Sequence, residues 1–268
     1  MKLINMQNKL ALLEHKLSAY HNVAIAFSGG VDSTFLLLCA KRVLGSAALA
    51  VTVTGPNFAP DEIEYAKEFC KKHEIPQLMI RMEDELFQSF AHNPQDRCYI
   101  CKHGIFSDMR ENLMDIPIFD GTNADDAKDY RPGRLALKEL GILSPLEEIG
   151  FTKKEIRLAL KAMNVEIWDK PAYACLASRI PYGETITLEK LTAIYQIEHA
   201  LKELGFTQVR LRHHGEIARI EVLPEDREKF CNAEIMDKVN KLVKDAGFTY
   251  ACLDLGGYIM GNLNGEII

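Results

Sequence analysis

Short apolar segments alternate with amphipathic ones along the first half of the chain, and this alternation constrains the fold more than any other feature. Apolar segments that read as buried strands occupy residues 23–27, 48–54, 77–81 and 116–120. Helical periodicity predicts helices near residues 1–20, 34–44, 61–73, 83–90 and 102–114. Strands that are apolar on both faces and joined by helices are typical of a parallel sheet. The sequence therefore predicts an α/β fold, a parallel sheet with helices on both faces.

The pattern changes after Phe151. A helix is expected at 152–162, followed by an irregular segment at 169–183 that contains two prolines. Beyond it the order helix, strand, strand, helix, strand is predicted at 188–204, 208–213, 217–222, 224–246 and 249–255. This order is typical of a small α+β unit with its own sheet. We therefore expect two domains, 1–183 and a smaller C-terminal α+β domain at 184–268 that serves substrate binding and self-association.

Composition excludes several classes of protein. Hydrophobic residues make up 47% of the chain and charged residues 26%, as in a folded protein with a real core. No apolar run exceeds six residues, whereas a bilayer-spanning helix needs about 20. The polar start of the chain does not resemble a secretory signal, so we expect a cytoplasmic protein. A net charge of −6 disfavours nucleic acid as a partner.

The segment Ser28-Gly29-Gly30-Val31-Asp32-Ser33 carries the strongest functional signal, because it lies between a predicted buried strand and a helix. The glycines allow a tight turn that presents backbone N–H groups, and the helix N-terminus adds its positive end. Ser28 and Ser33 add hydroxyl donors, whereas Asp32 would repel phosphates unless a Mg²⁺ ion lay between them. The Gly-Lys-Ser/Thr ending of a Walker A motif is missing, which disfavours kinase chemistry. A turn that merely caps the helix is the alternative.

With this motif the chain resembles the PP-loop superfamily of ATP pyrophosphatases, whose signature is SGGxDS after the first strand. The resemblance implies that ATP is cleaved between the α and β phosphates. It also implies that the loop holds the leaving pyrophosphate and that AMP is attached to an oxygen of the substrate. Donors around the departing pyrophosphate would stabilise the charge that grows in the transition state.

A second polar cluster follows the strand at 116–120. Thr122, Asn123 and Asp125, with Asp129 beyond them, come at the carboxyl end of that strand, where ligands bind in open α/β sheets. We expect Arg131 and Arg134 to contact ATP phosphates or the adenylated intermediate. The alternative is that these residues only form turns.

Three of the seven cysteines are expected in loops. Cys98 and Cys101 form a CxxC pair, and Cys175 lies in the irregular segment. Three thiolates can hold zinc or a four-iron cluster with one open position. The other cysteines lie inside predicted helices or strands and are expected to be small buried hydrophobes: Cys39, Cys70, Cys231 and Cys252.

Three further segments narrow the resemblance to the LarE-type sulfur transferases, which mature a nickel-pincer nucleotide cofactor. They are DGTNADDAKDYRPG from Asp120, ACLASRIPYG from Ala174 and VRLRHHGEIARIEV from Val209. In that family ATP adenylates a carboxylate of a pyridinium bis-carboxylic acid mononucleotide, and sulfur then replaces the activated oxygen. One branch sacrifices the sulfur of a single cysteine, matched by Cys175. The other holds a [4Fe-4S] cluster on three cysteines, matched by Cys98, Cys101 and Cys175, and the resemblance implies this branch.

Arginines and glutamates complete the candidate site. Arg179 follows Cys175 by four residues and is a candidate for holding an anionic substrate; a surface arginine beside a proline turn is the alternative. Arg210, Arg212 and His214 alternate along a predicted strand, so they share one face. The resemblance assigns Arg210 and Arg212 to substrate, with Glu198 and Glu221 as matching acidic positions. A solvated strand face is the alternative.

The preferred hypothesis is an AMP-forming sulfur transferase that uses ATP, Mg²⁺ and a [4Fe-4S] cluster on a small nucleotide substrate, as a homo-oligomer. A tRNA thiolase of the same superfamily is an alternative, and salt-sensitive tRNA binding would favour it. An amide-forming synthetase leaves the loop cysteines unexplained. A non-catalytic ATP-binding regulator would release no pyrophosphate with any substrate.

Overall fold

The computed structural model describes residues 2–128, 132–171 and 173–259. The chain divides into two compact units. Unit 1 comprises Met1–Phe90 and Asp96–Tyr173, and unit 2 comprises Ala91–Gln95 and Ala174–Ile268. The domain boundary near Gly183 stays a prediction.

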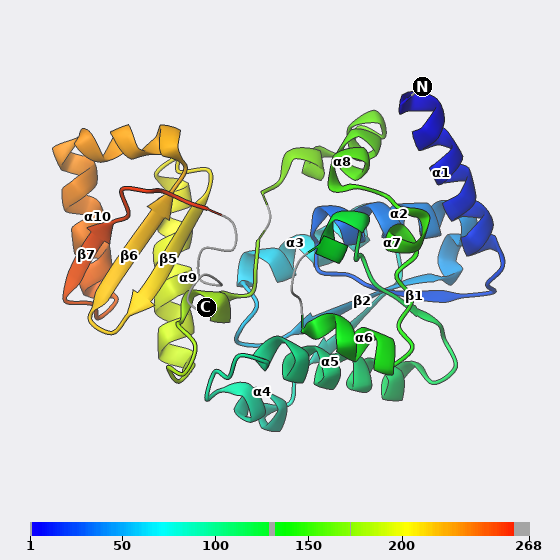
Figure 1. Cartoon of the computed structure of the whole chain (residues 1–268), viewed down its shortest axis with the longest axis horizontal. Coiled ribbons are helices and arrows are strands. Elements are labelled where there is room, and N and C mark those ends of the chain that lie inside the picture. Colours follow the sequence, from blue (N-terminus) through cyan, green and yellow to red (C-terminus); the bar gives the residue numbers. More distant parts are fainter. Residues whose placement is uncertain (1, 129–131, 172, 260–268) are drawn as a thin grey trace. The chain divides into compact units, whose positions relative to one another are not determined.

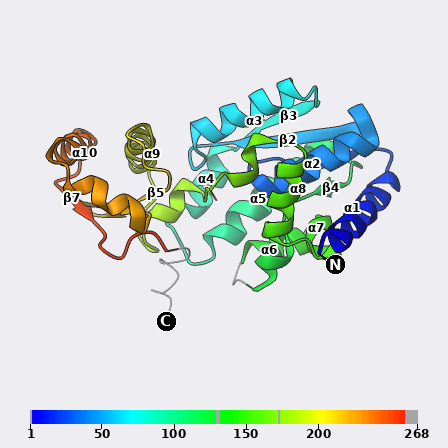
Figure 2. The same cartoon turned by 90° about the horizontal axis from the view of Figure 1, so that it is seen from above.

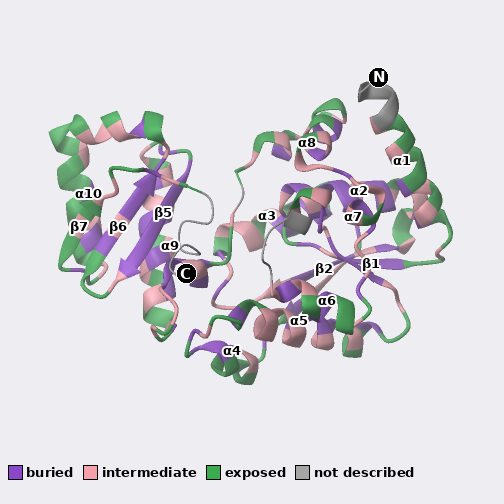
Figure 3. Ribbon diagram, in the orientation of Figure 1, coloured by how far each residue is buried: buried purple, intermediate pink, exposed green. Residues whose placement is uncertain are grey.

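Unit 1 is built on a four-stranded sheet with the order β3-β2-β1-β4 (Figure 1). Its strands are β1 (Val23–Ala26), β2 (Ala48–Thr54), β3 (Gln77–Arg81) and β4 (Ile118–Phe119). All pairs are parallel, and Ile25 of the central strand lies between Ala50 and Phe119. The inner strands are mostly buried (Figure 3). The predicted parallel sheet is confirmed.

Helices cover both faces of this sheet, with α2, α7 and α8 on one side and α5 and α6 on the other in Figure 1. One hydrophobic core cluster joins the buried side chains of β1, α2, α3 and α8. The α-helices of unit 1 are α1 (Lys2–Ser18), α2 (Val31–Leu44), α3 (Pro60–Lys72), α4 (Asp84–Phe90), α5 (Arg97–Leu113), α6 (Gly133–Glu139), α7 (Pro145–Ile149) and α8 (Lys153–Ala162). Short 3₁₀ helices occur at Gly45–Ala47, Ala124–Lys128 and Glu166–Asp169.

Helix α5 begins five residues before the helix expected from residue 102. The carbonyl oxygen of Asp96 accepts hydrogen bonds from the N–H groups of Tyr99 (2.7 Å) and Ile100 (3.2 Å), which closes an additional first turn. The prediction that Cys98 and Cys101 lie in a loop is therefore wrong, because both belong to α5.

Unit 2 contains a three-stranded sheet of β5 (Val209–His214), β6 (Ile217–Val222) and β7 (Tyr250–Leu253). The β5–β6 pair is antiparallel and the β6–β7 pair is parallel. Helices α9 (Leu188–Glu203) and α10 (Ala233–Asp245) pack against this sheet and lie side by side in Figure 2. Two 3₁₀ helices complete the unit, η4 (Leu176–Arg179) and η5 (Pro224–Cys231). The order helix, strand, strand, helix, strand agrees with the prediction.

A short segment between α4 and α5 belongs to unit 2. The side chain of Asn93 is buried and donates to the carbonyl oxygens of Ile180 (3.2 Å) and Pro181 (2.7 Å). In return, Gly183 donates its N–H to the carbonyl of Asn93, and Ile186 to that of Ala91. Residues 91–95 are thus tied to the chain that follows η4.

Candidate functional site

The phosphate loop connects β1 to α2. Gly29 has a φ of +71°, and a Cβ built there would lie 3.1 Å from the Tyr65 ring, so this turn favours glycine. The hydroxyl oxygens of Ser28 and Ser33 lie 3.3 Å apart, and Ser33 donates to the carbonyl of Gly30. Among the described residues, no side chain caps the first turn of α2. Its N–H groups are thus available to an anion such as a phosphate.

Asp32 lies at the start of α2 beside a lysine that the sequence analysis missed. The Nζ atom of Lys153, at the start of α8, lies 2.5 Å from Oδ2 of Asp32. The other oxygen, Oδ1, is buried and has no hydrogen-bond partner among the described residues. Burial raises the pKa of Asp32, and the charge of Lys153 opposes that rise. A buried carboxylate oxygen without a donor fits a cation ligand, so Asp32 suits Mg²⁺ beside a phosphate.

The loop that follows β4 packs directly against the phosphate loop. A Cβ built on Gly121 would lie 2.9 Å from the backbone nitrogen of Ser33. Asp120 is buried and accepts hydrogen bonds from the hydroxyls of Thr122 and Ser144. The carboxylate of Asp125 accepts the backbone N–H of Lys153 at 2.8 Å. Lys153 therefore links the two loops through its backbone and its side chain.

The remaining residues that were predicted to contact ATP differ in their burial and in their hydrogen-bond partners. Asn123 is buried, and its side-chain oxygen accepts the N–H of Asp125 at 2.9 Å. Arg134 is half-buried and forms an ion pair with Glu147. Arg131, like Asp129, lies outside the described residues. The ATP-contacting roles of these residues stay predictions.

A second lysine, also missed, contacts the phosphate loop from the segment after the 3₁₀ helix at Glu166–Asp169. The Nζ atom of Lys170 lies 2.6 Å from the carboxylate of Glu62 and 3.3 Å from the carbonyl oxygen of Gly29. It also lies 4.3 Å from the centre of the Tyr65 ring, a cation–π contact. Sequence offers little signal for either lysine, although the Thr152–Glu155 capping box marks the start of α8 beside Lys153.

The CxxC pair lies in the first two turns of α5, with Cys98 exposed and Cys101 half-buried. Residues three apart on a helix share a face, so both thiols are directed to the same side. The side-chain nitrogen of Asn57, in the loop after β2, lies 4.0 Å from Sγ of Cys101 and donates to it. Cys101 is thus near the carboxyl end of β2, the sheet edge that also carries the phosphate loop. Sequence analysis did not single out Asn57.

The other cysteines divide into two groups. Cys39 and Cys70 are buried as predicted, and burial raises the pKa of each thiol to about 12. Cys231 and Cys252 are exposed, so the prediction that they are buried is wrong. Cys231 ends the surface helix η5, and Cys252 lies on β7, which is an edge strand whose outward face is uncovered.

In unit 2, Cys175 is exposed and immediately precedes η4. Neither unit by itself contains all three predicted cluster ligands, because Cys98 and Cys101 belong to unit 1. Within the described residues, no group of three or more His, Cys, Asp or Glu side chains is gathered as a metal site. The three-cysteine cluster therefore stays a proposal.

The predicted arginines and glutamates of unit 2 form a buried network. Glu198 forms a two-point ion pair with Arg179, with N–O distances of 2.9 and 2.8 Å. Arg212 pairs with Glu221 at 2.9 Å, and the guanidinium of Arg210 lies 5.1 Å from the centre of the Tyr258 ring. Arg179 is fully buried, and Arg210 and Arg212 nearly so. The alternatives of a surface arginine and a solvated strand face are therefore wrong.

Arg219 joins this network, because it contacts Glu221 and Asp254. Burial disfavours the charged form of Glu198, but the Arg179 guanidinium outweighs it and holds the pKa of Glu198 below its usual range. The Nε atom of Arg212 is buried with no acceptor in the described part of the chain. A buried donor without an acceptor fits an anionic ligand.

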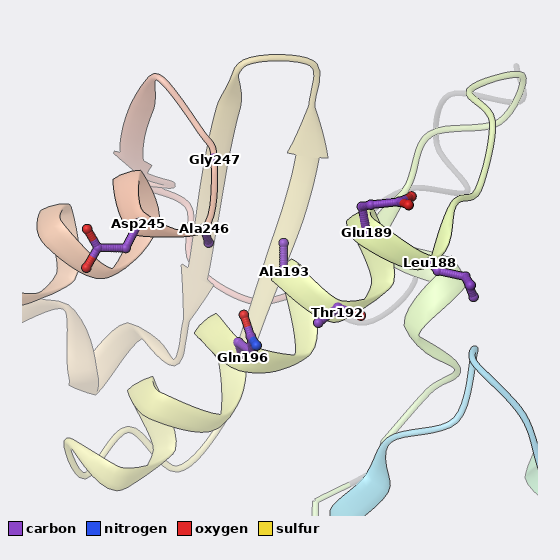
Figure 4. A pocket seen from close by; sticks show the side chains of 8 residues that line it. All are labelled: Leu188, Glu189, Thr192, Ala193, Gln196, Asp245, Ala246 and Gly247. Atoms are coloured by element: carbon purple, nitrogen blue, oxygen red, sulfur yellow. The ribbon is translucent and has the colours of Figure 1, made fainter.

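An open groove in unit 2 contains none of the predicted residues. It has a volume of about 560 Å³ and is lined by the exposed side of α9 and the end of α10 (Figure 4). No titratable group other than Glu189 and Asp245 lines it, so it offers no chemistry comparable to the loops above.

The fold and the phosphate loop define an α/β nucleotide-binding protein of the PP-loop ATP pyrophosphatase class. Residues 13–103 match the asparagine synthase family. The chain is 34% identical to the pyridinium-3,5-bisthiocarboxylic acid mononucleotide synthase of Lactiplantibacillus plantarum, over 97% of this chain and 95% of that protein. It belongs to the family of that synthase, as the resemblance in sequence motifs predicted.

Two further relatives span the chain. An uncharacterised protein of Synechocystis sp. is 37% identical over 97% of this chain and 98% of its own length. An uncharacterised protein of Methanocaldococcus jannaschii is 28% identical over 96% of this chain and 97% of its own length. The chain is thus an enzyme of the PP-loop superfamily and a homologue of a pyridinium-3,5-bisthiocarboxylic acid mononucleotide synthase. In the part of the chain that the structure describes, no helix is long and apolar enough to cross a membrane.

Proposed function

We propose that this protein is an ATP-dependent, AMP-forming sulfur transferase that acts on a pyridinium bis-carboxylic acid mononucleotide. The observation that carries the proposal is 34% identity to the L. plantarum synthase over 97% of the chain. The phosphate loop supports the same chemistry, because it offers backbone N–H groups and an unpaired buried carboxylate oxygen at one place. The product is a thiocarboxylate, as expected for a precursor of a nickel-pincer nucleotide.

In the first step a substrate carboxylate oxygen attacks the α-phosphorus of ATP. The bond from the α-phosphorus to its bridging oxygen breaks, and pyrophosphate leaves with that oxygen. N–H groups of the first turn of α2 and the hydroxyls of Ser28 and Ser33 stabilise the growing negative charge. Asp32 would hold a Mg²⁺ ion, which supplies charge neutralisation at the leaving phosphates. With Asp32 engaged in that way, the ammonium group of Lys153 would be available to contact a phosphate.

Unit 2 supplies the binding site for the anionic substrate. Its network brings buried guanidinium groups together. In the described part of the chain, Nε of Arg212 is a buried donor without an acceptor, which a phosphate or carboxylate oxygen would satisfy. Arg210 contributes positive charge on the same face of β5. Glu198 and Glu221 hold these guanidinium groups in place and do not meet an anionic substrate directly.

In the second step sulfur replaces the activated oxygen, and AMP leaves. Cys98, Cys101 and Cys175 would together hold a [4Fe-4S] cluster with one open iron, which supplies the sulfur for transfer. The two thiols of α5 suit this role because they share one face of a helix turn. The alternative source is the sulfur of Cys175 itself.

The experiment is an anaerobic assay with Mg²⁺, ATP, sulfide and the pyridinium bis-carboxylic acid mononucleotide. We expect AMP and pyrophosphate in equal amounts, and a product heavier by the exchange of oxygen for sulfur. The Asp32→Asn variant is the control and should form neither. Formation of ADP and phosphate would contradict the proposed cleavage, and an unmodified mononucleotide would contradict sulfur transfer.

Iron content tests the sulfur source. About four irons and four acid-labile sulfides per chain in anaerobically prepared protein would support the cluster. Protein without iron that still transfers sulfur once, and that carries dehydroalanine at position 175 afterwards, would assign the sulfur to Cys175.

A further inference from the structure

Arg179 occupies an unusual position for an arginine, because its side chain is fully buried. Its Nε and Nη2 atoms donate to the two carboxylate oxygens of Glu198 on α9, a planar two-point ion pair. Oε1 of Glu198 also accepts the backbone N–H of Leu211 at 2.9 Å. The guanidinium is therefore fixed to both α9 and β5.

The other end of this guanidinium holds the backbone around Cys175. Its Nη1 atom donates to the carbonyl oxygens of Ala174 (2.7 Å) and Cys175 (3.1 Å). It also lies 3.1 Å from the hydroxyl of Ser178. The thiol that these contacts surround is exposed. The exposed thiol of Cys175 is thus carried by a backbone segment that is hydrogen-bonded to the buried guanidinium of Arg179.

A second buried arginine reinforces the same turn. Nη1 of Arg212 donates to the carbonyl oxygen of Ser178 at 3.1 Å, while its Nη2 is paired with Glu221 on β6. The carbonyl oxygen of Cys175 also accepts the N–H of Ser178, which closes the start of η4. The turn 174–178 is consequently bonded to guanidinium groups that are anchored on α9 and β6.

Stability alone does not account for the Arg179–Glu198 pair. Two charges removed from water gain little over a well-packed apolar pair of similar volume, because desolvation offsets their attraction. An apolar pair, however, offers no donors to the carbonyls of Ala174 and Cys175. What the charged pair adds is a fixed direction for the backbone that carries the thiol.

We infer that Arg179 is a positioning residue, which together with Glu198 holds the Cys175 turn in the geometry required for sulfur delivery. The inference rests on the proposed function for the role of Cys175. It replaces the expectation that Arg179 binds the anionic substrate, because each guanidinium nitrogen of Arg179 already donates to a protein oxygen, whereas Nε of Arg212 has no acceptor among the described residues. Reactions between bound groups depend steeply on placement, so loosening this turn lowers the rate of transfer.

The test compares wild type with the Arg179→Gln/Glu198→Gln double variant. This pair leaves no uncompensated buried charge, retains an acceptor for Leu211, and is too short at position 179 to reach both carbonyls. Arg227→Gln is the matched control, because Arg227 is a half-buried arginine of unit 2 that also donates to backbone carbonyls but lies far from residues 174–178 in sequence. We measure the hydrogen exchange of two peptides, 174–183 and 217–222. The alkylation rate of Cys175 and the steady-state kinetics are measured on the same proteins.

We expect amide exchange in 174–183 to be about tenfold to a hundredfold faster in the double variant, with 217–222 unchanged. The alkylation rate of Cys175 should change, while that of Cys252, also exposed in unit 2, should not. For sulfur transfer, kcat should fall and KM for the mononucleotide should stay within about twofold, which separates positioning from substrate contact. Arg227→Gln should behave as wild type throughout.

Unchanged exchange in 174–183 with an unchanged kcat would overturn the inference. A raised KM with an unchanged kcat would instead make Arg179 a substrate contact. If the double variant fails to fold, Arg179→Lys decides by the same measurements, since an ammonium keeps the charge but not the fork of donors. If wild type forms no thiocarboxylate, the proposed function fails, while exchange and alkylation still decide whether Arg179 holds the turn.

Discussion

Gly121→Ala tests whether the loop after β4 fixes the shape of the phosphate loop. The added methyl would lie 2.9 Å from the backbone nitrogen of Ser33 and 3.2 Å from the carbonyl carbon of Asp32. Ordinary contact begins near 3.4 Å, so the two loops must separate by about 0.5 Å. Both neighbours are backbone atoms at the start of α2, and no side chain can turn aside to make room.

Overpacking of this kind costs about 1–3 kcal/mol of stability. A misplacement of about 1 Å costs on the order of a hundredfold in rate. A displacement of about 0.5 Å therefore predicts about a tenfold loss in kcat/KM for ATP. Urea unfolding measures the first quantity and pyrophosphate release the second. Gly104→Ala is the control, since the three atoms nearest to its methyl all belong to the flexible Leu86 side chain on α4.

The control should lose stability without losing ATP-dependent activity beyond about twofold. An unchanged kcat/KM for ATP in Gly121→Ala would refute the argument that this contact shapes the phosphate loop. Equal losses of activity in both variants would show that general destabilisation, and not the position of Ser33, is responsible.

Three further predictions concern charge and sulfur. Burial raises the pKa of Asp32, so the folded chain loses stability as the pH rises from 3.8 through that raised pKa. Urea unfolding at pH 7 should therefore show that Asp32→Asn is at least as stable as wild type, although this variant releases no pyrophosphate. The pKa of Glu198 is lowered, so its contribution is present above pH 4.5 and is lost as pH falls through the folded-state pKa. Glu198→Gln alone should therefore cost about 3–5 kcal/mol at pH 7, because it leaves Arg179 unpaired, and thermal unfolding should show a smaller difference at pH 4. If three thiolates hold a cluster, the alanine variants of Cys98, Cys101 and Cys175 should lose iron and sulfur transfer equally. An iron assay and the product mass measure these losses, and an active Cys98→Ala enzyme would contradict the prediction.

The sheet of unit 1 could be predicted because its strands are apolar on both faces and each is contiguous in sequence. The start of α5 could not, because the polar residues around Cys98 show no helical periodicity and the first turn depends on the carbonyl of Asp96. Propensity gives no warning of such a turn, which is closed by backbone bonds alone.

The phosphate loop is also contiguous, so its chemistry was visible in six residues. The partner of Asp32 was not, because Lys153 is 121 residues away in sequence and only the fold brings α8 to the loop. Likewise the pattern placed Arg210 and Arg212 on one face of a strand but did not reveal that they are buried. Burial of arginine depends on a carboxylate partner, and Glu221 lies on the neighbouring strand.

The segment 91–95 also has a consequence for the order in which the protein folds during synthesis. Asn93 leaves the ribosome 88 residues before Pro181, whose carbonyl its side chain binds. At about 5–20 residues per second, this buried amide waits roughly 4–18 seconds for its partner. Strand β4 and helices α5 to α8 are synthesised within that interval, after the first three strands of the sheet. The first unit can therefore form while the side chain of Asn93 still lacks its partner, and residues 91–95 acquire their native contacts only when the second unit is made.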